Sequence, residues 1–198
     1  IPINIPGLNQ FINEIPNGNL ILIEGTFDPI KTIFVQQLAS VAFEHGFEVI
    51  YISSRAKEEV IKQIAQYNGE QHHFIMVEER SHRHWKDSLK KNSLLVIDSF
   101  SYLILDKTLS EVRMILEELD MLCKQLNSII FLTVDLGMLD EKVNVTVSHL
   151  ADGIFMFLSR NTSNGIARFI RIPKWSNTKS YDDNIFYTFD GKKINVDL

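Results

Sequence analysis

The sequence predicts one α/β domain over residues 1–198, with a mostly parallel β-sheet flanked by helices and extended by antiparallel C-terminal hairpins. Three observations support this fold class. Short apolar runs alternate with helical periodicity, these runs lack polar alternation, and turn-rich strand patterns replace the helices after about residue 150. A chain of 198 residues is also long enough to bury the core of one such domain.

The first part of the chain predicts parallel strands joined by helices. Apolar runs at residues 19–24, 47–53, 73–78, 93–99 and 128–133 predict strands, and helical spacing predicts helices over 30–44, 56–67 and 109–126. Strands that alternate with helices of this length pair in parallel through right-handed crossovers. Because the runs are apolar throughout, we expect both faces of the sheet to be covered.

The last part of the chain predicts antiparallel strands. Strand patterns cover residues 153–160, 167–172, 184–189 and 193–196, and only short turns separate them. Asn164-Gly165 and Asp190-Gly191 have the turn chemistry of β-hairpins. We therefore expect an antiparallel extension at one edge of the parallel sheet.

Composition and charge exclude several classes of protein. Hydrophobic residues make up 45% and charged residues 23% of the chain, as in ordinary globular proteins. The net charge of −5 argues against electrostatic nucleic-acid binding by the domain as a whole, so such binding would need a local patch. The lone Cys123 fits a reducing compartment. With no membrane-spanning run and no secretory signal, we expect a cytoplasmic protein.

A candidate phosphate loop lies between the first strand and the first helix, at residues 25–32 (GTFDPIKT). The Walker A pattern is G-x-x-x-x-G-K-[ST] in this structural context. Gly25, Lys31 and Thr32 stand at the required spacing, whereas Ile30 replaces the second glycine. These three matching residues are the first candidates for a nucleotide site.

Three features of this loop disfavour a phosphate ligand. Pro29 lacks an N–H donor, and β-branched Ile30 resists the positive φ that the missing glycine would allow. Asp28 adds a negative charge where a triphosphate would lie. The loop therefore predicts the loss of tight ATP binding. In the structural alternative, Lys31 and Thr32 merely begin a helix, with Thr32 as a local cap.

Five segments carry a resemblance to a known family. They are GLNQFI at 7–12, IPNGNLILIEG at 15–25, LLVIDS at 94–99, HLADGI at 149–154 and DGKKI at 190–194. With these segments the chain resembles the RecA superfamily, in particular the group of KaiC and the archaeal RadA paralogues. The IP-x-G and LADG segments are the more specific ones. The resemblance implies a RecA-like P-loop domain with a degenerate Walker A loop.

The resemblance also implies roles for further residues. Asp98 matches the Walker B aspartate, which positions Mg²⁺ through water; the alternative is a strand-end aspartate that caps a turn. Ser54 and Arg55 stand where the family has its catalytic glutamate, and neither is a general base. Of the K-x-R pair that reaches a neighbouring subunit's γ-phosphate, only Lys174 is present. We therefore predict no catalytic residue.

Two functional hypotheses follow from the resemblance. The first is a pseudo-ATPase that binds no nucleotide, or ATP and Mg²⁺ only weakly, and acts as a regulatory or scaffold subunit in an oligomer with RecA-like subunits. Recombinase paralogues and Elongator subunits are precedents in nucleic-acid transactions, and residues 1–6 are expected to dock on a neighbour. The alternative is a weakly active KaiC-like ATPase in which Lys31, Thr32 and Asp98 still hold Mg-ATP.

A basic segment is the candidate for nucleic-acid binding. Basic groups interleaved with an aromatic ring can bind phosphates and stack a base. The alternative is a solvated helix face or loop. The nearby histidines fit no zinc template, so we predict no metal site. The nucleic-acid candidates are Arg80, Arg83, Trp85, Lys86 and Lys90, and the C-terminal strands add Arg160, Arg168, Arg171, Lys174 and Lys179.

Overall fold

A nine-stranded sheet runs through the part of the chain that the structure describes, in the order β3-β2-β4-β5-β1-β6-β7-β8-β9. The computed structural model describes residues 1–26, 29–68, 75–77, 82–163, 165–176, 179–191 and 193–196. The elements are the 3-10 helix η1 (Leu8–Gln10), β1 (Asn19–Gly25), α1 (Ile30–Glu44), β2 (Glu48–Ser53), α2 (Lys57–Asn68), β3 (Ile75–Val77), α3 (His82–Ser88), β4 (Ser93–Asp98), α4 (Phe100–Leu103), α5 (Leu109–Leu126), β5 (Ile129–Asp135), α6 (Glu141–Leu150), β6 (Gly153–Thr162), β7 (Gly165–Trp175), β8 (Lys179–Phe189) and β9 (Ile194–Val196).

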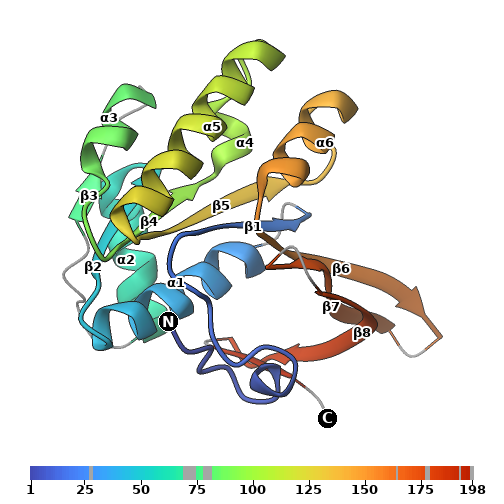
Figure 1. Cartoon of the computed structure of the whole chain (residues 1–198). Coiled ribbons are helices and arrows are strands. Elements are labelled where there is room, and N and C mark those ends of the chain that lie inside the picture. The colour runs from blue at the N-terminus through green and yellow to red at the C-terminus, as the bar shows by residue number, and fades with distance from the viewer. Residues whose placement is uncertain are drawn as a thin grey trace.

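The predicted fold class is confirmed. β1 pairs in parallel with β5 and β6, and β2 pairs in parallel with β3 and β4, whereas β6 to β9 pair with one another in antiparallel. Figure 1 shows α1 and α2 on one face of the sheet and α3 to α6 on the other, with the antiparallel strands extending beyond the helices. The predicted hairpin extension therefore lies at one edge of a parallel, doubly covered sheet.

The sheet separates two hydrophobic layers. In β1, Ile21 and Ile23 join the layer that includes α1, and Leu20 and Leu22 join the layer that includes α5. All four side chains are at most 1% exposed. Successive residues of a strand point to opposite faces, so a strand that both layers cover must be apolar at every position. This explains the lack of polar alternation in the sequence.

The predicted helices over 30–44 and 109–126 are confirmed at both ends. α5 begins with a capping box between Thr108 and Glu111 and ends at Asn127, which has a φ of 52°. The sequence did not predict α4 or α6. In α6, three valines and a threonine weaken the local helical preference, and its apolar face becomes evident only where Val147 packs into the core.

The LADG segment joins β6 to β1. The Asp152 carboxylate accepts a hydrogen bond from the Leu20 amide at 2.9 Å, and the Asp152 amide donates to the Leu20 carbonyl at 2.8 Å. A Cβ at Gly153 would lie 2.9 Å from side-chain atoms of Ile21 and of Trp175. This segment therefore has a structural role, because it sets the close approach of the two strands.

The N-terminal arm, residues 1–6, packs on its own domain. Ile1, Ile3 and Ile5 are buried in the α1 layer, and the Val196 amide donates to the Pro6 carbonyl at 3.1 Å. The apolar side chains of the arm are therefore covered within the chain, and its docking on a neighbouring subunit stays a prediction.

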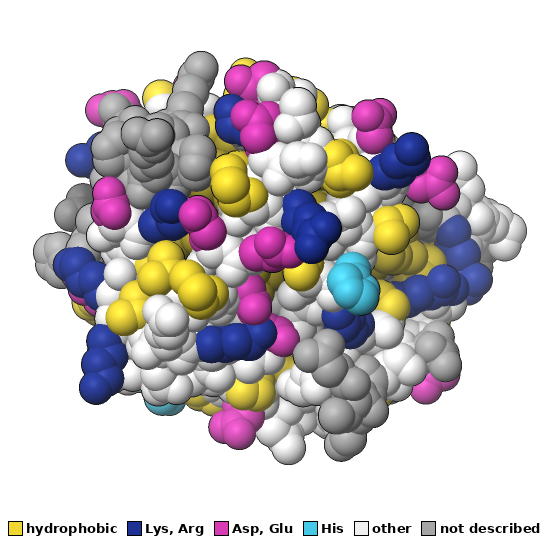
Figure 2. Space-filling model, turned by 45° about the horizontal axis from the view of Figure 1, so that its top comes forward, with side chains coloured by type: hydrophobic (Ala, Val, Ile, Leu, Met, Phe, Trp, Pro, Cys, Tyr) yellow, Lys and Arg dark blue, Asp and Glu magenta, His cyan; other side chains and the backbone are white. Residues whose placement is uncertain are grey.

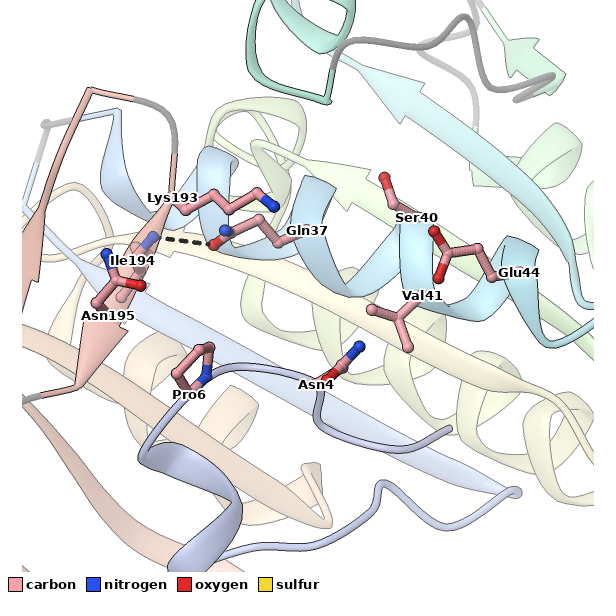
Figure 3. Close-up of a pocket in the computed structure, with 9 residues that line it drawn as sticks. All are labelled: Asn4, Pro6, Gln37, Ser40, Val41, Glu44, Lys193, Ile194 and Asn195. Atoms are coloured by element: carbon pink, nitrogen blue, oxygen red, sulfur yellow. Dashed lines mark hydrogen bonds between the residues drawn. The ribbon is translucent and has the colours of Figure 1, made fainter.

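A polar groove of about 350 Å³ remains between the arm, α1 and β9 (Figure 3). Gln37 bridges two of these elements, since its side-chain oxygen accepts a hydrogen bond from the Ile194 amide at 3.4 Å. Polar side chains from all three elements line the groove, which favours a hydrated space over a docking site. None of the described helices is both long and apolar enough to cross a membrane.

Candidate functional site

The candidate nucleotide residues meet at the carboxyl ends of β1, β4 and β5, beside the first turn of α1. Register places Gly25 of β1 opposite Asp135 of β5, and Asp98 ends β4. A cavity of about 340 Å³ opens here. Its lining is Pro29, Lys31, Thr32, Ser54, Arg55, Asp98, Ser99, Tyr102, Asp135 and Met138. Ligands of open α/β sheets bind at this edge, so the cavity lies where a nucleotide would be expected.

Lys31 is paired inside the chain. The Lys31 residue is 3% exposed, and its ammonium lies 2.9 Å from the Asp135 carboxylate and donates a further hydrogen bond to the Thr26 carbonyl. Gly25 makes room for this arrangement, because a Cβ there would lie 3.1 Å from Cγ and Cδ of Lys31. The charge that a P-loop lysine offers to phosphate is therefore already balanced.

Asp135 is a fixed counter-ion. Its carboxylate accepts hydrogen bonds from the Ser99 hydroxyl at 2.7 Å and the Ser101 hydroxyl at 3.1 Å. Burial alone would raise the pKa of Asp135, but the bonds from Lys31 and the two serines, with the charge of Lys31, hold it below its ordinary value of 3.8. The carboxylate is therefore ionised at neutral pH.

Sequence reasoning missed Asp135, because the predicted fifth strand ended at Thr133. The sequence signal that could have revealed it is that Asp135 lies two residues beyond an apolar run, just as Asp98 lies at the end of one. Only the parallel register between β1 and β5 places it beside Lys31.

Asp98 accepts hydrogen bonds from three buried hydroxyls. The donors are Thr32 at 3.0 Å, Thr133 at 2.7 Å and Tyr51 at 2.7 Å, and the partly exposed Arg55 guanidinium lies at 3.4 Å. Burial first, and then the charge of Asp98, raise the pKa of Tyr51 well above its ordinary value, so its hydroxyl stays protonated and donates. Asp98 is 4% exposed. It joins β4 to α1, β2 and β5 instead of capping the turn that follows it.

The first turn of α1 differs from that of a P-loop. Pro29 has a φ of −72°, and the helix begins at Ile30, the position that corresponds to the second glycine of the Walker pattern. Ile30 is 4% exposed and belongs to the core. Asp28, which the sequence predicts to repel phosphate, lies outside the described residues. At this position a core side chain of a helix replaces the glycine of a phosphate loop.

The charged side chains of this cavity are paired with one another. The described charged side chains that line the cavity are the cations Lys31 and Arg55 and the carboxylates Asp98 and Asp135, which balance one another. A triphosphate needs excess positive charge and converging N–H donors, and its Mg²⁺ needs accessible oxygens. Here the lysine is paired, and Thr32 donates its hydroxyl to Asp98.

The positions that match the family's catalytic glutamate and its K-x-R lysine also have local partners. The Ser54 amide donates to the Asp98 carbonyl at 2.9 Å, and the Ser54 hydroxyl accepts from the Ser99 amide at 3.4 Å. The Lys174 ammonium donates to the carbonyls of His149 at 2.9 Å and Ser148 at 3.4 Å, at the C-terminal end of α6. A lysine at that end of a helix satisfies carbonyls that lack helical partners. Lys174 therefore has a structural partner within its own chain.

The structure describes part of the basic segment, in which one candidate is buried and two have acidic partners. Trp85 is 0% exposed and packs edge-on to Phe100 with ring centroids 6.2 Å apart, so the expectation that it stacks on a base is wrong. Lys86 pairs with Glu118, and Lys90 pairs with Glu48, each at 2.7 Å. Arg80 and the side chain of Arg83 lie outside the described residues.

Over most of the face shown in Figure 2, cationic and acidic side chains are interspersed. On the C-terminal strands, the Arg160 guanidinium lies over the rings of Phe169 and Phe186, and Arg171 lies over Phe169, at 5.5 to 5.9 Å from the centroids. Binding of nucleic acid stays a prediction.

Comparison with known proteins identifies the fold. No protein-family model matches the sequence, and no curated protein matches it. Among solved structures, the flagellar accessory protein FlaH from Methanocaldococcus jannaschii matches with a TM-score of 0.82 and 21% identity, over 100% of this chain and 98% of that one. The KaiC-like protein PH0186 from Pyrococcus horikoshii OT3 matches with a TM-score of 0.81 and 18% identity, over the same shares. The chain therefore has a RecA-like, KaiC-like fold.

Proposed function

We propose that this domain is a pseudo-ATPase, a RecA-like regulatory or scaffold subunit that neither holds nor hydrolyses Mg-ATP at its P-loop position. One observation carries the proposal: the buried ion pair between Lys31 and Asp135 at 2.9 Å. A phosphate group would have to displace a carboxylate that two serine hydroxyls also hold. The Asp135 carboxylate is negatively charged, as a phosphate is, so it competes with a phosphate for the Lys31 ammonium.

Two further features support the proposal. Asp98 is engaged by three hydroxyl donors, and the stretch after β2 offers Ser54 and Arg55 in place of a carboxylate base. Without a base to activate water and without an accessible cation at the phosphate position, hydrolysis lacks both of its usual contributors. The fold is kept while the chemistry is lost.

The proposed partners are other RecA-like subunits, as a second copy or as an active relative. The similarity to FlaH and to the KaiC-like protein supports this choice only through the shared fold. Nucleic acid is less favoured, because Lys86 and Lys90 of the basic segment already have acidic partners.

A weakly active ATPase is the second candidate. The cavity of about 340 Å³ still borders Lys31, Thr32 and Asp98, which is the observation in its favour. For this function Lys31 would have to exchange Asp135 for a phosphate when ATP binds. The two candidates therefore differ in whether the ion pair opens at accessible ATP concentrations.

Removing the counter-ion tests the proposal. Asp135→Asn leaves Lys31 without an anionic partner and keeps the size of the side chain, so the affinity for Mg-ATP should rise about 10- to 100-fold, the value of one charge-assisted hydrogen bond of about 1.5–3 kcal/mol. Fluorescence titration with a labelled ATP analogue, confirmed by competition with unlabelled Mg-ATP, measures the change.

Asp120→Asn is the matched control. It removes the same charge and also releases a lysine, Lys124, from a surface ion pair on α5. We expect it to leave Mg-ATP binding unchanged. Equal affinities for wild type and Asp135→Asn would show that Asp135 does not block the site, and the proposal would then lose its main support.

A further inference from the structure

A second cavity lies next to the ends of β1 and β5 and beside α6, and it shares no lining residue with the cavity at Lys31. Its volume is about 500 Å³. Leu136 and Val145 provide apolar walls, and Val145 is 63% exposed at the surface of α6. The polar lining includes Glu24, Asn144, Ser148 and Lys174.

Glu24 is a buried carboxylate that has no ion pair with the described residues. It is 6% exposed, and its Oε1 accepts a hydrogen bond from the Ser148 hydroxyl at 3.2 Å. Its other oxygen accepts no hydrogen bond from the described residues, and the residue lines the cavity. Burial raises the pKa of Glu24, and the bond from Ser148 offsets only part of that effect.

The cation that lines the same cavity does not neutralise Glu24. The Lys174 ammonium is held by the carbonyls of Ser148 and His149, and no ion pair joins it to Glu24 among the described residues. A carboxylate that is nearly buried is costly unless a cation and hydrogen-bond donors accompany it. A ligand that brings both would remove this cost.

We propose that this cavity binds a primary ammonium group on an unbranched aliphatic stem, with the ammonium donating to Glu24 and the stem lying against Leu136 and Val145. An ammonium is a compact charge with three donors, and its stem packs on apolar surface. A divalent metal ion is a poorer match, because Glu24 is the only carboxylate among the described lining residues and such ions need several oxygen ligands. The ammonium comes from a lysine of another copy of this chain or from a free small amine.

The full-length chain can be titrated with n-butylammonium while NMR follows the methyl signals of Leu136 and Val145, with n-butanol as the uncharged probe of equal length. We expect saturable shifts with n-butylammonium only. Glu24→Gln should weaken binding by about tenfold or more, because it removes the charge but keeps the shape. Glu117→Gln, the same substitution at a surface ion pair on α5, should leave binding unchanged.

Stability separates a binding defect from misfolding. Because burial raises the pKa of Glu24, its ionised form destabilises the fold at neutral pH, so Glu24→Gln should raise the Tm while it loses the ligand. The proposal would be overturned if Glu24→Gln still gave the same n-butylammonium shifts. It would also be overturned if n-butanol bound the wild type with the same affinity as n-butylammonium.

Sedimentation velocity distinguishes the two sources of the ammonium. If the wild type is an assembly and Glu24→Gln dissociates it, the ammonium is a lysine of another copy. If the wild type is a monomer that binds n-butylammonium and stays monomeric, the ligand is a free amine. The proposal is wrong if n-butylammonium gives no saturable shift and Glu24→Gln also leaves the assembly state unchanged.

Discussion

Asp98→Ala is expected to lower the free energy of unfolding by about 3 kcal/mol, because it leaves buried hydroxyl donors without an acceptor. Tyr51, Thr133 and Thr32 all donate to this carboxylate, at 2.7 to 3.0 Å. The contact with Arg55 contributes little, since that side chain is 40% exposed. For a domain of this size, the change corresponds to a Tm lower by roughly 10 °C.

Urea unfolding measures this change, and a second substitution tests its cause. Tyr51→Phe removes one of the orphaned donors, so Asp98→Ala/Tyr51→Phe should be more stable than Asp98→Ala alone. Asp98→Asn, which retains a carbonyl acceptor, should be intermediate. If Asp98→Ala has wild-type stability, Asp98 does not serve as the structural acceptor that the hydrogen bonds indicate.

Lys31→Met is expected to destabilise the protein by about 3 kcal/mol at neutral pH, because it leaves the Asp135 carboxylate inside the structure without its cation. In the wild type the ionised Asp135 stabilises the fold at pH values above 3.8, the ordinary pKa of an aspartate. This contribution is lost as the pH falls through the lowered pKa of Asp135. Without Lys31, only the hydrogen bonds from the serine hydroxyls still counter the effect of burial on the pKa of Asp135, so this pKa rises.

The pH dependence of unfolding distinguishes this effect from simple loss of packing. In the wild type, Asp135 adds stability as the pH rises through its lowered pKa to the ordinary value of 3.8 and little above it, whereas the raised pKa in Lys31→Met should make stability fall from about pH 4 to pH 7. Lys31→Met/Asp135→Asn should recover part of the lost stability, since no unpaired charge is left. Parallel stability curves for wild type and Lys31→Met would contradict the account of the ion pair.

The fold could be predicted because its determinants are local. The apolar run before Gly25 and the helical spacing from Ile30 to Glu44 each specify their element without distant information, and β1 and α1 form there. The missed helix α6 shows the limit: its valines favour strands locally, and only packing of residues such as Val147 into the core favours the helix.

The site could be predicted only in part. Spacing identified Lys31 and Thr32, the family resemblance identified Asp98, and the structure brings all three to one cavity. Their partners Asp135, Thr133 and Tyr51 come from other strands, so only the sheet order and register reveal them. For the same reason the sequence did not reveal the burial of Trp85: its neighbours on the basic segment are polar, but it packs edge-on to Phe100 in the core layer that includes α5.

Calorimetric titration of the wild-type protein with Mg-ATP tests the central claim most directly. Because Lys31 is neutralised by Asp135, we expect no saturable heat up to about 1 mM nucleotide. Binding in the micromolar range would contradict this account, since it would show that ATP opens the ion pair and that the site still functions as a nucleotide site.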